Sequence, residues 1–268
     1  MDFQGKVVVV TGAASGIGQA CVHGFAARNA TVAMVDRKPV TERELGGYRQ
    51  HGGHVEFFPA DVSSRPAVEN VVAEITQRFG RIDVLVNNAG IQRYATVTSA
   101  SEEEWDEVMN VNLKSAFLMA KYCIPHMLEV GGGSIVTTGS VQSLTAQRNS
   151  VHYVASKHAL LGLTRSIALD FGKQNIRANC VLPGAIDTPM LRWAASLGAD
   201  PQGVLDAIDK IHIRGKMGRP EEVANVIVFL SSDMASLVTG SAVVVDGGLL
   251  VPAGGMAFQE VGTGAIKA

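Results

Sequence analysis

The chain has 268 residues, of which 29 are glycine, 47% are hydrophobic and 18% are charged, and its formal net charge is −2. This composition excludes an intrinsically disordered chain, because disorder requires low hydrophobicity and high net charge. It also argues against a nucleic-acid-binding protein, which needs a basic excess, and against collagen, which needs glycine at every third position. A globular protein whose backbone makes close approaches is expected.

Seven short runs rich in β-branched residues alternate with longer stretches of helical periodicity. Several runs are continuously apolar, which is typical of parallel strands covered by helices on both faces. The alternation predicts right-handed βαβ units and a single-domain α/β fold, a Rossmann-type doubly wound parallel sheet of about seven strands. The predicted strands are Val7–Val10, Thr31–Val35, Val55–Phe58, Ile82–Val86, Ser134–Thr138, Ile176–Val181 and Ala242–Val245.

Two segments depart from this alternation. The catalytic domain is expected to span residues 1–248, and a long insert within it, at 187–219, is expected to form a lid over the substrate. Residues 249–268 form a tail with several glycines and apolar side chains. We expect this tail to pack at a subunit interface, with a frayed terminus as the alternative.

The cysteines and the start of the chain indicate which cellular compartment to expect. Cys21, Cys123 and Cys180 are widely separated and form no Cys-x-x-Cys pair, so we expect three small core residues and neither disulfides nor a metal site. No apolar run is long enough to cross a bilayer, and no signal-peptide pattern is present. We therefore expect a cytoplasmic protein with no membrane and no nucleic-acid partner.

The first predicted strand leads into a glycine-rich run, Thr11–Gly18, with glycines at positions 12, 16 and 18. Such glycines permit a tight turn and let the backbone approach a pyrophosphate at the start of the following helix. The spacing is Gly-x-x-x-Gly-x-Gly and is weak by itself, since a simple turn would also use it. Its position between a strand and a helix predicts a dinucleotide site.

Asp36 ends the second predicted strand, eighteen residues after Gly18. A carboxylate at this point can accept hydrogen bonds from both adenosine ribose hydroxyls, and it would repel a 2′-phosphate. Arg37 follows it and could instead bind a 2′-phosphate. We expect NAD as the cofactor, with NADP as the alternative.

A second group of residues concerns catalysis. Ser140 precedes Tyr153 and Lys157, which are four residues apart and therefore share one face of a helix. A phenol is a poor base at neutral pH, and a neighbouring ammonium, helped by the positive nicotinamide ring, would lower its pKa by stabilising the phenolate. Tyr153 could then remove a proton from an alcohol while a hydride leaves the carbon.

These motifs together resemble the short-chain dehydrogenase/reductase family over nearly all of residues 5–248. The resemblance is carried by Thr11–Gly18, Asp61-Val62, Asn87-Asn88-Ala89-Gly90, Asn112, Ser140, Tyr153 with Lys157, and Pro183-Gly184. It implies a catalytic tetrad of Asn112, Ser140, Tyr153 and Lys157. In this tetrad Ser140 would orient the substrate oxygen, and Asn112 would support a water through which the proton leaves.

The resemblance also implies a cofactor site and a homotetramer. Asp61 would accept from the adenine amino group, Lys157 would hold the nicotinamide ribose, and Thr188 would reach the carboxamide. The full expected set is Gly12, Ser15, Gly16, Ile17, Gly18, Asp36, Asp61, Val62, Asn88, Ala89, Gly90, Tyr153, Lys157, Pro183, Gly184, Ile186 and Thr188.

The family shapes its substrate pocket with three variable loops. The expected substrate residues are Gln92, Ser140, Gln142, Arg148, Tyr153, Met190 and Trp193. Arg148 lies five residues before Tyr153, and a guanidinium suits carboxylate recognition because it donates two parallel hydrogen bonds. We therefore expect an anionic, hydroxylated small molecule, and the alternative is that Arg148 is a surface residue or a subunit contact.

The expected activity is NAD-dependent oxidation of a secondary alcohol on a sugar-acid-like substrate. The most similar members of the family are sugar and sugar-acid dehydrogenases, including those that act on 2-keto-3-deoxy-L-fuconate. Three alternatives stay open: a 3-oxoacyl-[acyl-carrier-protein] reductase, a non-catalytic NAD-binding regulatory protein, and a methyltransferase. His152 and His158 fit no metal pattern, and both are expected at the surface or at an interface.

Overall fold

Seven parallel strands form one sheet in the order β3-β2-β1-β4-β5-β6-β7, which confirms the predicted doubly wound fold. The computed structural model describes residues 1–49 and 53–251. The strands are β1 (Val7–Thr11), β2 (Thr31–Asp36), β3 (His54–Pro59), β4 (Val84–Asn87), β5 (Gly133–Thr138), β6 (Ile176–Pro183) and β7 (Ala242–Val245). Each overlaps one of the seven predicted runs, and β7 matches its run to the residue.

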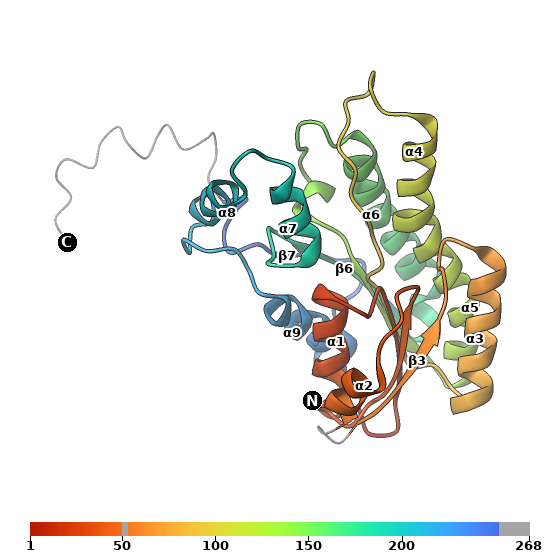
Figure 1. Ribbon diagram of the computed structural model, residues 1–268. Helices are drawn as coiled ribbons and strands as arrows, with labels where there is room; N and C mark the ends of the chain where they lie inside the picture. The colour runs from red at the N-terminus through yellow and green to blue at the C-terminus, as the bar shows by residue number, and fades with distance from the viewer. Residues whose placement is uncertain (50–52, 252–268) are drawn as a thin grey trace.

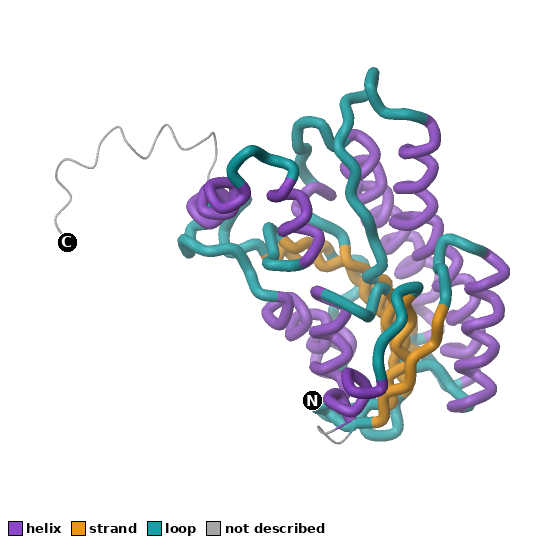
Figure 2. Tube along the Cα trace, in the orientation of Figure 1, coloured by secondary structure: helices purple, strands orange, loops and turns teal. Residues whose placement is uncertain are grey.

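Helices cover both faces of the sheet (Figure 1). One face carries α1 (Gly16–Ala26), α2 (Glu42–Arg49) and α9 (Pro220–Ser231), and the other carries α3 (Arg65–Phe79), α5 (Ser115–Glu129) and α6 (Val151–Phe171). Figure 2 shows the strands enclosed between these two helical layers. Helix α4 (Glu102–Met109) continues into α5 through a π-helical turn, η1 (Asn110–Lys114). The short 3₁₀ turns are η2 (Val141–Ser143), η3 (Gly172–Gln174) and η4 (Asp233–Ala235).

Strand β1 explains why the sheet needs two helical layers. Its five residues are all buried, and their side chains alternate between the faces. Val8 and Val10 pack in the apolar cluster formed with α1 and α9, whereas Val7 and Val9 pack in the cluster formed with α3 and α5. A run of β-branched residues is therefore buried on both sides, as the sequence pattern predicts.

The predicted insert at 187–219 contains two helices, α7 (Pro189–Ser196) and α8 (Pro201–Lys210). Proline stands in the first turn of each, where its missing N–H costs nothing. Thr188 caps α7 by accepting from the Leu191 N–H at 3.3 Å, and Asp200 caps α8 by accepting from the Gly203 N–H at 3.0 Å. These local signals fix where both helices begin.

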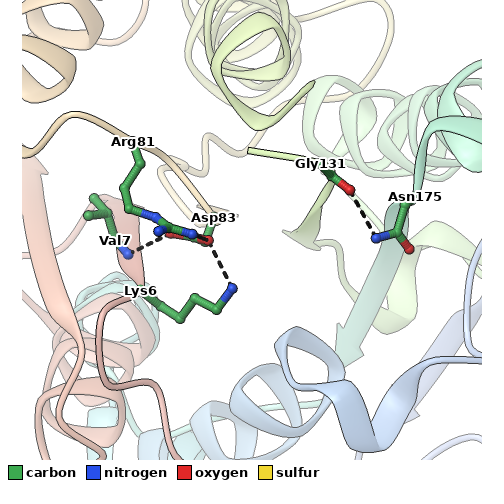
Figure 3. Close-up of polar contacts among 6 residues, drawn as sticks. All are labelled: Lys6, Val7, Arg81, Asp83, Gly131 and Asn175. Carbon is green, nitrogen blue, oxygen red and sulfur yellow. Dashed lines mark hydrogen bonds and ion pairs between the residues drawn. The ribbon is translucent and has the colours of Figure 1, made fainter. Parts of the chain in front are cut away.

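The amino end of the sheet carries a closed polar network around Asp83, whose side chain is only 6% exposed (Figure 3). One carboxylate oxygen accepts from Lys6 Nζ at 3.1 Å and from Arg81 at 2.6 Å, and the other accepts from the Val7 N–H at 2.9 Å and from Arg81 Nε at 2.8 Å. Burial pushes the pKa of Asp83 up, but these hydrogen bonds outweigh burial and hold the pKa below its usual value.

Asn175 closes a turn near β6, because its side-chain amide donates to the Gly131 carbonyl at 3.1 Å (Figure 3). Asn175 has φ +63°, a left-handed conformation that asparagine tolerates better than most residues.

Several predictions about segments outside the sheet can be compared with the fold. Cys21, Cys123 and Cys180 are buried as free thiols, which confirms their assignment to the core. Residues 249–251 of the predicted tail are described, and 252–268 lie outside the described residues. Across residues 1–49 and 53–251, no helix has the length and apolar character that a membrane span needs.

Candidate active site

A cavity of about 1010 Å³ lies where the carboxyl ends of the parallel strands meet. The sheet reverses its strand order between β1 and β4, and such switch points are where doubly wound folds bind their ligands. Of the predicted cofactor residues, those that line the cavity are Gly12, Ser15, Gly16, Ile17, Asp36, Asp61, Val62, Asn88, Ala89, Gly90, Tyr153, Lys157, Pro183, Gly184, Ile186 and Thr188. Gly18 is the one member of that predicted set that does not line it.

The glycine-rich turn is held against the rest of the site by close backbone contacts. A Cβ on Gly18 would lie 2.1 Å from the Gly12 carbonyl oxygen, and a Cβ on Gly12 would lie 2.8 Å from Ala89 Cα. Gly12 and Gly16 also have positive φ angles of 62° and 56°. Gly18 therefore contributes by allowing the turn to fold and not by facing the cavity.

The first turn of α1 leaves backbone N–H groups available. Ser15 is its N-cap residue, and the Ser15 side chain forms no capping hydrogen bond. Unpaired N–H groups at a helix start, together with glycines that keep side chains away, are the features that pyrophosphate binding requires.

Asn88 ties the glycine turn to the neighbouring strands. Its side-chain amide donates to the Thr11 and Gly12 carbonyls, both at 3.1 Å, and its side-chain oxygen accepts from Thr138 Oγ1 at 3.3 Å. Thr11 Oγ1 accepts in return from the Asn88 and Ala89 N–H groups at 3.0 and 3.1 Å. Asn88 therefore positions the glycine turn in addition to lining the cavity.

Asp36 stands at the rim of the same cavity, with Arg37 beside it. Its two carboxylate oxygens accept from the Ala14 and Lys38 N–H groups, each at 2.9 Å. A carboxylate has about four lone-pair sites, so these bonds leave capacity for two further donors. A hydrogen bond from the Ser63 side chain lowers the pKa of Asp61, and the positive charge of Arg37 adds a smaller effect in the same direction.

Tyr153, Lys157 and Ser140 lie together in the cavity, as their sequence spacing predicts. Lys157 Nζ is 5.4 Å from the centre of the Tyr153 ring and donates to the Thr138 carbonyl at 2.7 Å. Ser140 is hydrogen-bonded to the Tyr153 side chain. All three are buried, with Lys157 only 4% exposed.

Burial dominates the electrostatics of this group. Burial raises the pKa of Tyr153 to about 12, and the hydrogen bond with Ser140 opposes this only in part. Burial also lowers the pKa of Lys157 to about 8. Desolvation disfavours both charged forms in the protein by itself, and the expectation that the lysine and the positive nicotinamide ring together lower the tyrosine pKa stays a prediction for the cofactor-loaded site.

Asn112 lies behind the residues that line the cavity and is not one of them. Its side-chain oxygen accepts from the Ile91 N–H at 2.8 Å, and its amide donates to the Ile91 carbonyl at 3.0 Å and to Ser156 Oγ at 3.1 Å. These bonds tie η1 to the loop after β4 and to α6. The observed contacts are those of a residue that positions this loop.

The predicted substrate residues divide into two groups. Gln92, Ser140, Gln142, Arg148, Tyr153 and Met190 line the cavity. Trp193 does not; its ring stacks on that of Tyr94 with centroids 6.1 Å apart and an interplanar angle of 24°. Arg148 is exposed on the loop between η2 and α6.

Sequence reasoning missed one wall of the cavity. Val204, Ile208 and Ile211, from α8 and the residue after it, line the cavity together with Leu249. The spacing of the first three, i, i+4 and i+7, is the signal that could have identified an inward-facing helix within the insert.

His152 corrects another expectation, because it is fully buried and does not lie at the surface. Helix α4 packs against α6, the helix that carries His152. The His152 Nδ1 accepts from the Tyr153 N–H at 3.2 Å, and burial lowers the pKa of His152. His158 is exposed, as expected.

Comparison with known proteins agrees with this architecture. A family described as enoyl-(acyl carrier protein) reductase matches residues 12–250. The 3-oxoacyl-[acyl-carrier-protein] reductase of Thermotoga maritima is 40% identical and covers 94% of this chain and 100% of its own. The D-threitol dehydrogenase of Mycolicibacterium smegmatis is 36% identical over 93% of this chain and 95% of its own. Among solved structures, the aldohexose dehydrogenase of Thermoplasma acidophilum is 36% identical, covers 93% and 96% of the two chains, and superposes with a TM-score of 0.86.

The chain belongs to the short-chain dehydrogenase/reductase family. It is therefore an oxidoreductase that uses a nicotinamide dinucleotide, and the methyltransferase and the non-catalytic regulatory protein are set aside. The residues present fit such a cofactor, because the glycine turn admits no Cβ, the helix start has unpaired N–H groups, and Asp36 keeps spare acceptor capacity.

Proposed function

We propose that this enzyme oxidises a secondary alcohol of a hydroxylated, sugar-acid-like small molecule with NAD. The observation that carries the proposal is the burial of Ser140, Tyr153 and Lys157 in the same cavity as the glycine turn and Asp36. This combination supports a proton acceptor next to a dinucleotide site. 2-Keto-3-deoxy-L-fuconate is one compound of the proposed class.

The roles of the side chains follow from their contacts. Ser140 is bonded to the Tyr153 hydroxyl, so the two can hold one substrate oxygen between them. Tyr153, as the phenolate, would accept the proton of that alcohol and become neutral, and Lys157 would stabilise the phenolate before the transfer while its ammonium remains fixed by the Thr138 carbonyl. Asn112 would keep the Ile91 loop in place behind these groups. When bound, the oxidised nicotinamide supplies hydride acceptance.

The choice of NAD rests on Asp36. Its carboxylate is fixed by two backbone N–H groups at the end of β2, which is where ribose hydroxyls are expected. A 2′-phosphate would meet this negative charge. Arg37 also lines the cavity, so the preference is one of degree, and replacing Asp36 by Ala should raise the kcat/KM with NADP relative to that with NAD.

The proposed acid group rests on Arg148, which lines the cavity from an exposed loop. Helices α7 and α8 of the insert also line the cavity and would act as the lid. The combined proposal is tested by following absorbance at 340 nm with NAD and NADP over sugars, sugar acids and their neutral analogues. A larger loss of kcat/KM for an acid than for its neutral analogue in Arg148→Ala supports the acid; equal losses refute it.

A second candidate, reduction of a 3-oxoacyl thioester, is favoured by one observation. The wall formed by Val204, Ile208 and Ile211 is apolar and could contact an acyl chain. The Thermotoga maritima relative carries that name. Faster turnover of acetoacetyl thioesters with NADPH than of any alcohol with NAD would establish this candidate and exclude the first.

A further inference from the structure

One wall of the cavity carries a chain of polar side chains that the proposed reaction does not use. The Gln142 side-chain amide donates to Gln147 Oε1, and the Gln147 side chain acts in turn on Tyr94 by lowering its pKa against the effect of burial. All three residues line the cavity. The chain begins next to the reacting groups, because the Gln142 backbone N–H donates to Ser140 Oγ at 3.1 Å.

Tyr94 is fixed at the far end of this chain. Its ring stacks on Trp193 of α7, and the Tyr94 side chain is half-buried, which raises its pKa. The Tyr94 hydroxyl carries one O–H that can be donated to an acceptor in the cavity. Tyr94 is also near enough to Tyr153 for its charge to act on the pKa of Tyr153.

Gln142 is incompletely paired. Its side-chain oxygen is buried and has no hydrogen-bond partner among residues 1–49 and 53–251. Leaving a buried acceptor unpaired costs about 1–3 kcal/mol, a cost that a bound hydroxyl group would remove. Gln142 lies only two residues after Ser140 in one tight turn, η2, so a group bound by Gln142 lies beside a group bound by Ser140.

We propose that Gln142, Gln147 and Tyr94 form a subsite for a second substrate oxygen, and that the enzyme prefers alcohols with a hydroxyl or oxo group on the carbon next to the one oxidised. This specificity rests on the proposed alcohol oxidation. Tyr94 donates to the second oxygen and Gln142 accepts from it when it is a hydroxyl. A mono-alcohol of the same length leaves both groups unpaired.

The matched probes are 2,3-butanediol and 2-butanol, which differ by one hydroxyl group. We expect kcat/KM for the diol to exceed that for the mono-alcohol by about 100-fold, since sites that hydrogen-bond a hydroxyl reject analogues that lack it. Tyr94→Phe keeps the stacked ring and should lower this ratio about 10-fold, as should Gln142→Met. Tyr122→Phe is the matched control, because Tyr122 lies on α5 and its hydroxyl donates to Glu69 outside the cavity. Its ratio should equal that of the wild type.

Calorimetric titration of the NADH-loaded protein with each alcohol gives a readout that does not require turnover. Binding of the diol should weaken about 10-fold in Tyr94→Phe, whereas the control should bind as the wild type does. An unchanged ratio and an unchanged Kd in both Tyr94→Phe and Gln142→Met would overturn the subsite. If neither alcohol is oxidised, the screen over sugars and sugar acids decides the proposed function separately, and the Kd values for the diol still decide whether the subsite exists.

Discussion

The buried polar groups described at the two ends of the sheet differ in how far the protein itself satisfies them. At the amino end, Asp83 receives four hydrogen bonds from three residues, and its carboxylate is stabilised. At the carboxyl end, burial raises the pKa of Tyr153 and lowers that of Lys157, which favours the uncharged form of each, and the Gln142 oxygen has no partner in the described part of the chain. A satisfied polar group stabilises the fold, whereas an unsatisfied one is available to a ligand.

The largest expected effect comes from removing the proton acceptor. Tyr153→Phe should lower kcat by about 10³-fold, because general base catalysis contributes 10²–10⁴-fold. Since burial holds the pKa of Tyr153 near 12 and that of Lys157 near 8, alcohol oxidation by the wild type should rise between about pH 6 and pH 8 and rise less steeply above pH 8, where the Lys157 ammonium is lost. Steady-state kinetics and the Tm should be measured together; retained activity, or a large fall in Tm, would contradict the assignment.

At the opposite end, Asp83→Asn should affect stability and leave the chemistry intact. We expect a loss of about 2–3 kcal/mol, because charge-assisted hydrogen bonds are replaced by weaker ones. The folded pKa of Asp83 lies below its unfolded value, so its contribution is complete above about pH 4 and is lost as the pH falls through the folded pKa. Urea unfolding at pH 7 and at pH 3 measures both effects.

Asp106→Asn provides the control for this prediction, because Asp106 is exposed on α4. It should change the free energy of unfolding by less than about 0.5 kcal/mol. An equal loss in the two variants would show that the network around Asp83 contributes nothing specific.

The smallest expected change in stability has the opposite sign. Lys157→Met should abolish most activity but raise the stability at pH 7 by about 1 kcal/mol, because a buried ammonium is removed at the cost of one hydrogen bond to Thr138. The folded pKa of Lys157, about 8, lies below the unfolded value of 10.5. The penalty is therefore complete below pH 8 and disappears as the pH rises to 10.5.

Thermal unfolding of Lys157→Met and the wild type at pH 7 and pH 10 tests this difference. Lys114→Met, at an exposed position, is the control and should show no such dependence on pH. A variant less stable than the wild type at pH 7 would mean that Lys157 stabilises the fold, and the contrast between the two ends of the sheet would fail.

Local patterns predict the fold well because each strand carries its own signal. β1 and β7 are β-branched runs that the sequence identifies directly. The residues that line the cavity are predictable for a similar reason, since parallel strands bring the segments after their carboxyl ends together. The pKa values of Tyr153 and Lys157 are not predictable in this way, because they depend on how completely neighbouring elements cover these side chains.

Two placements were also beyond the reach of sequence reasoning. Burial of His152 results from the packing of α4 against α6, which no spacing within α6 reveals. The position of Asn112 behind the cavity depends on the π-helical turn η1, for which the sequence carries no recognised signal. In both cases the missing information is a contact between elements.

The π-helical turn has a consequence for which chain lengths the fold can accept. Residues 102–129 run without a break through α4, η1 and α5, so every residue sets the rotational phase of those before and after it. A π turn bonds residue i to residue i+5 and holds one residue more than an α turn, so removing one residue from η1 would convert it into α-helix and keep the phase of α4 and α5. Removing one residue from the α-helical parts on either side would instead rotate what precedes it by about 100°. Val108 would then leave the core, or Asn112 would lose the Ile91 backbone. Single-residue deletions should therefore be tolerated better in η1 than in α4 or α5.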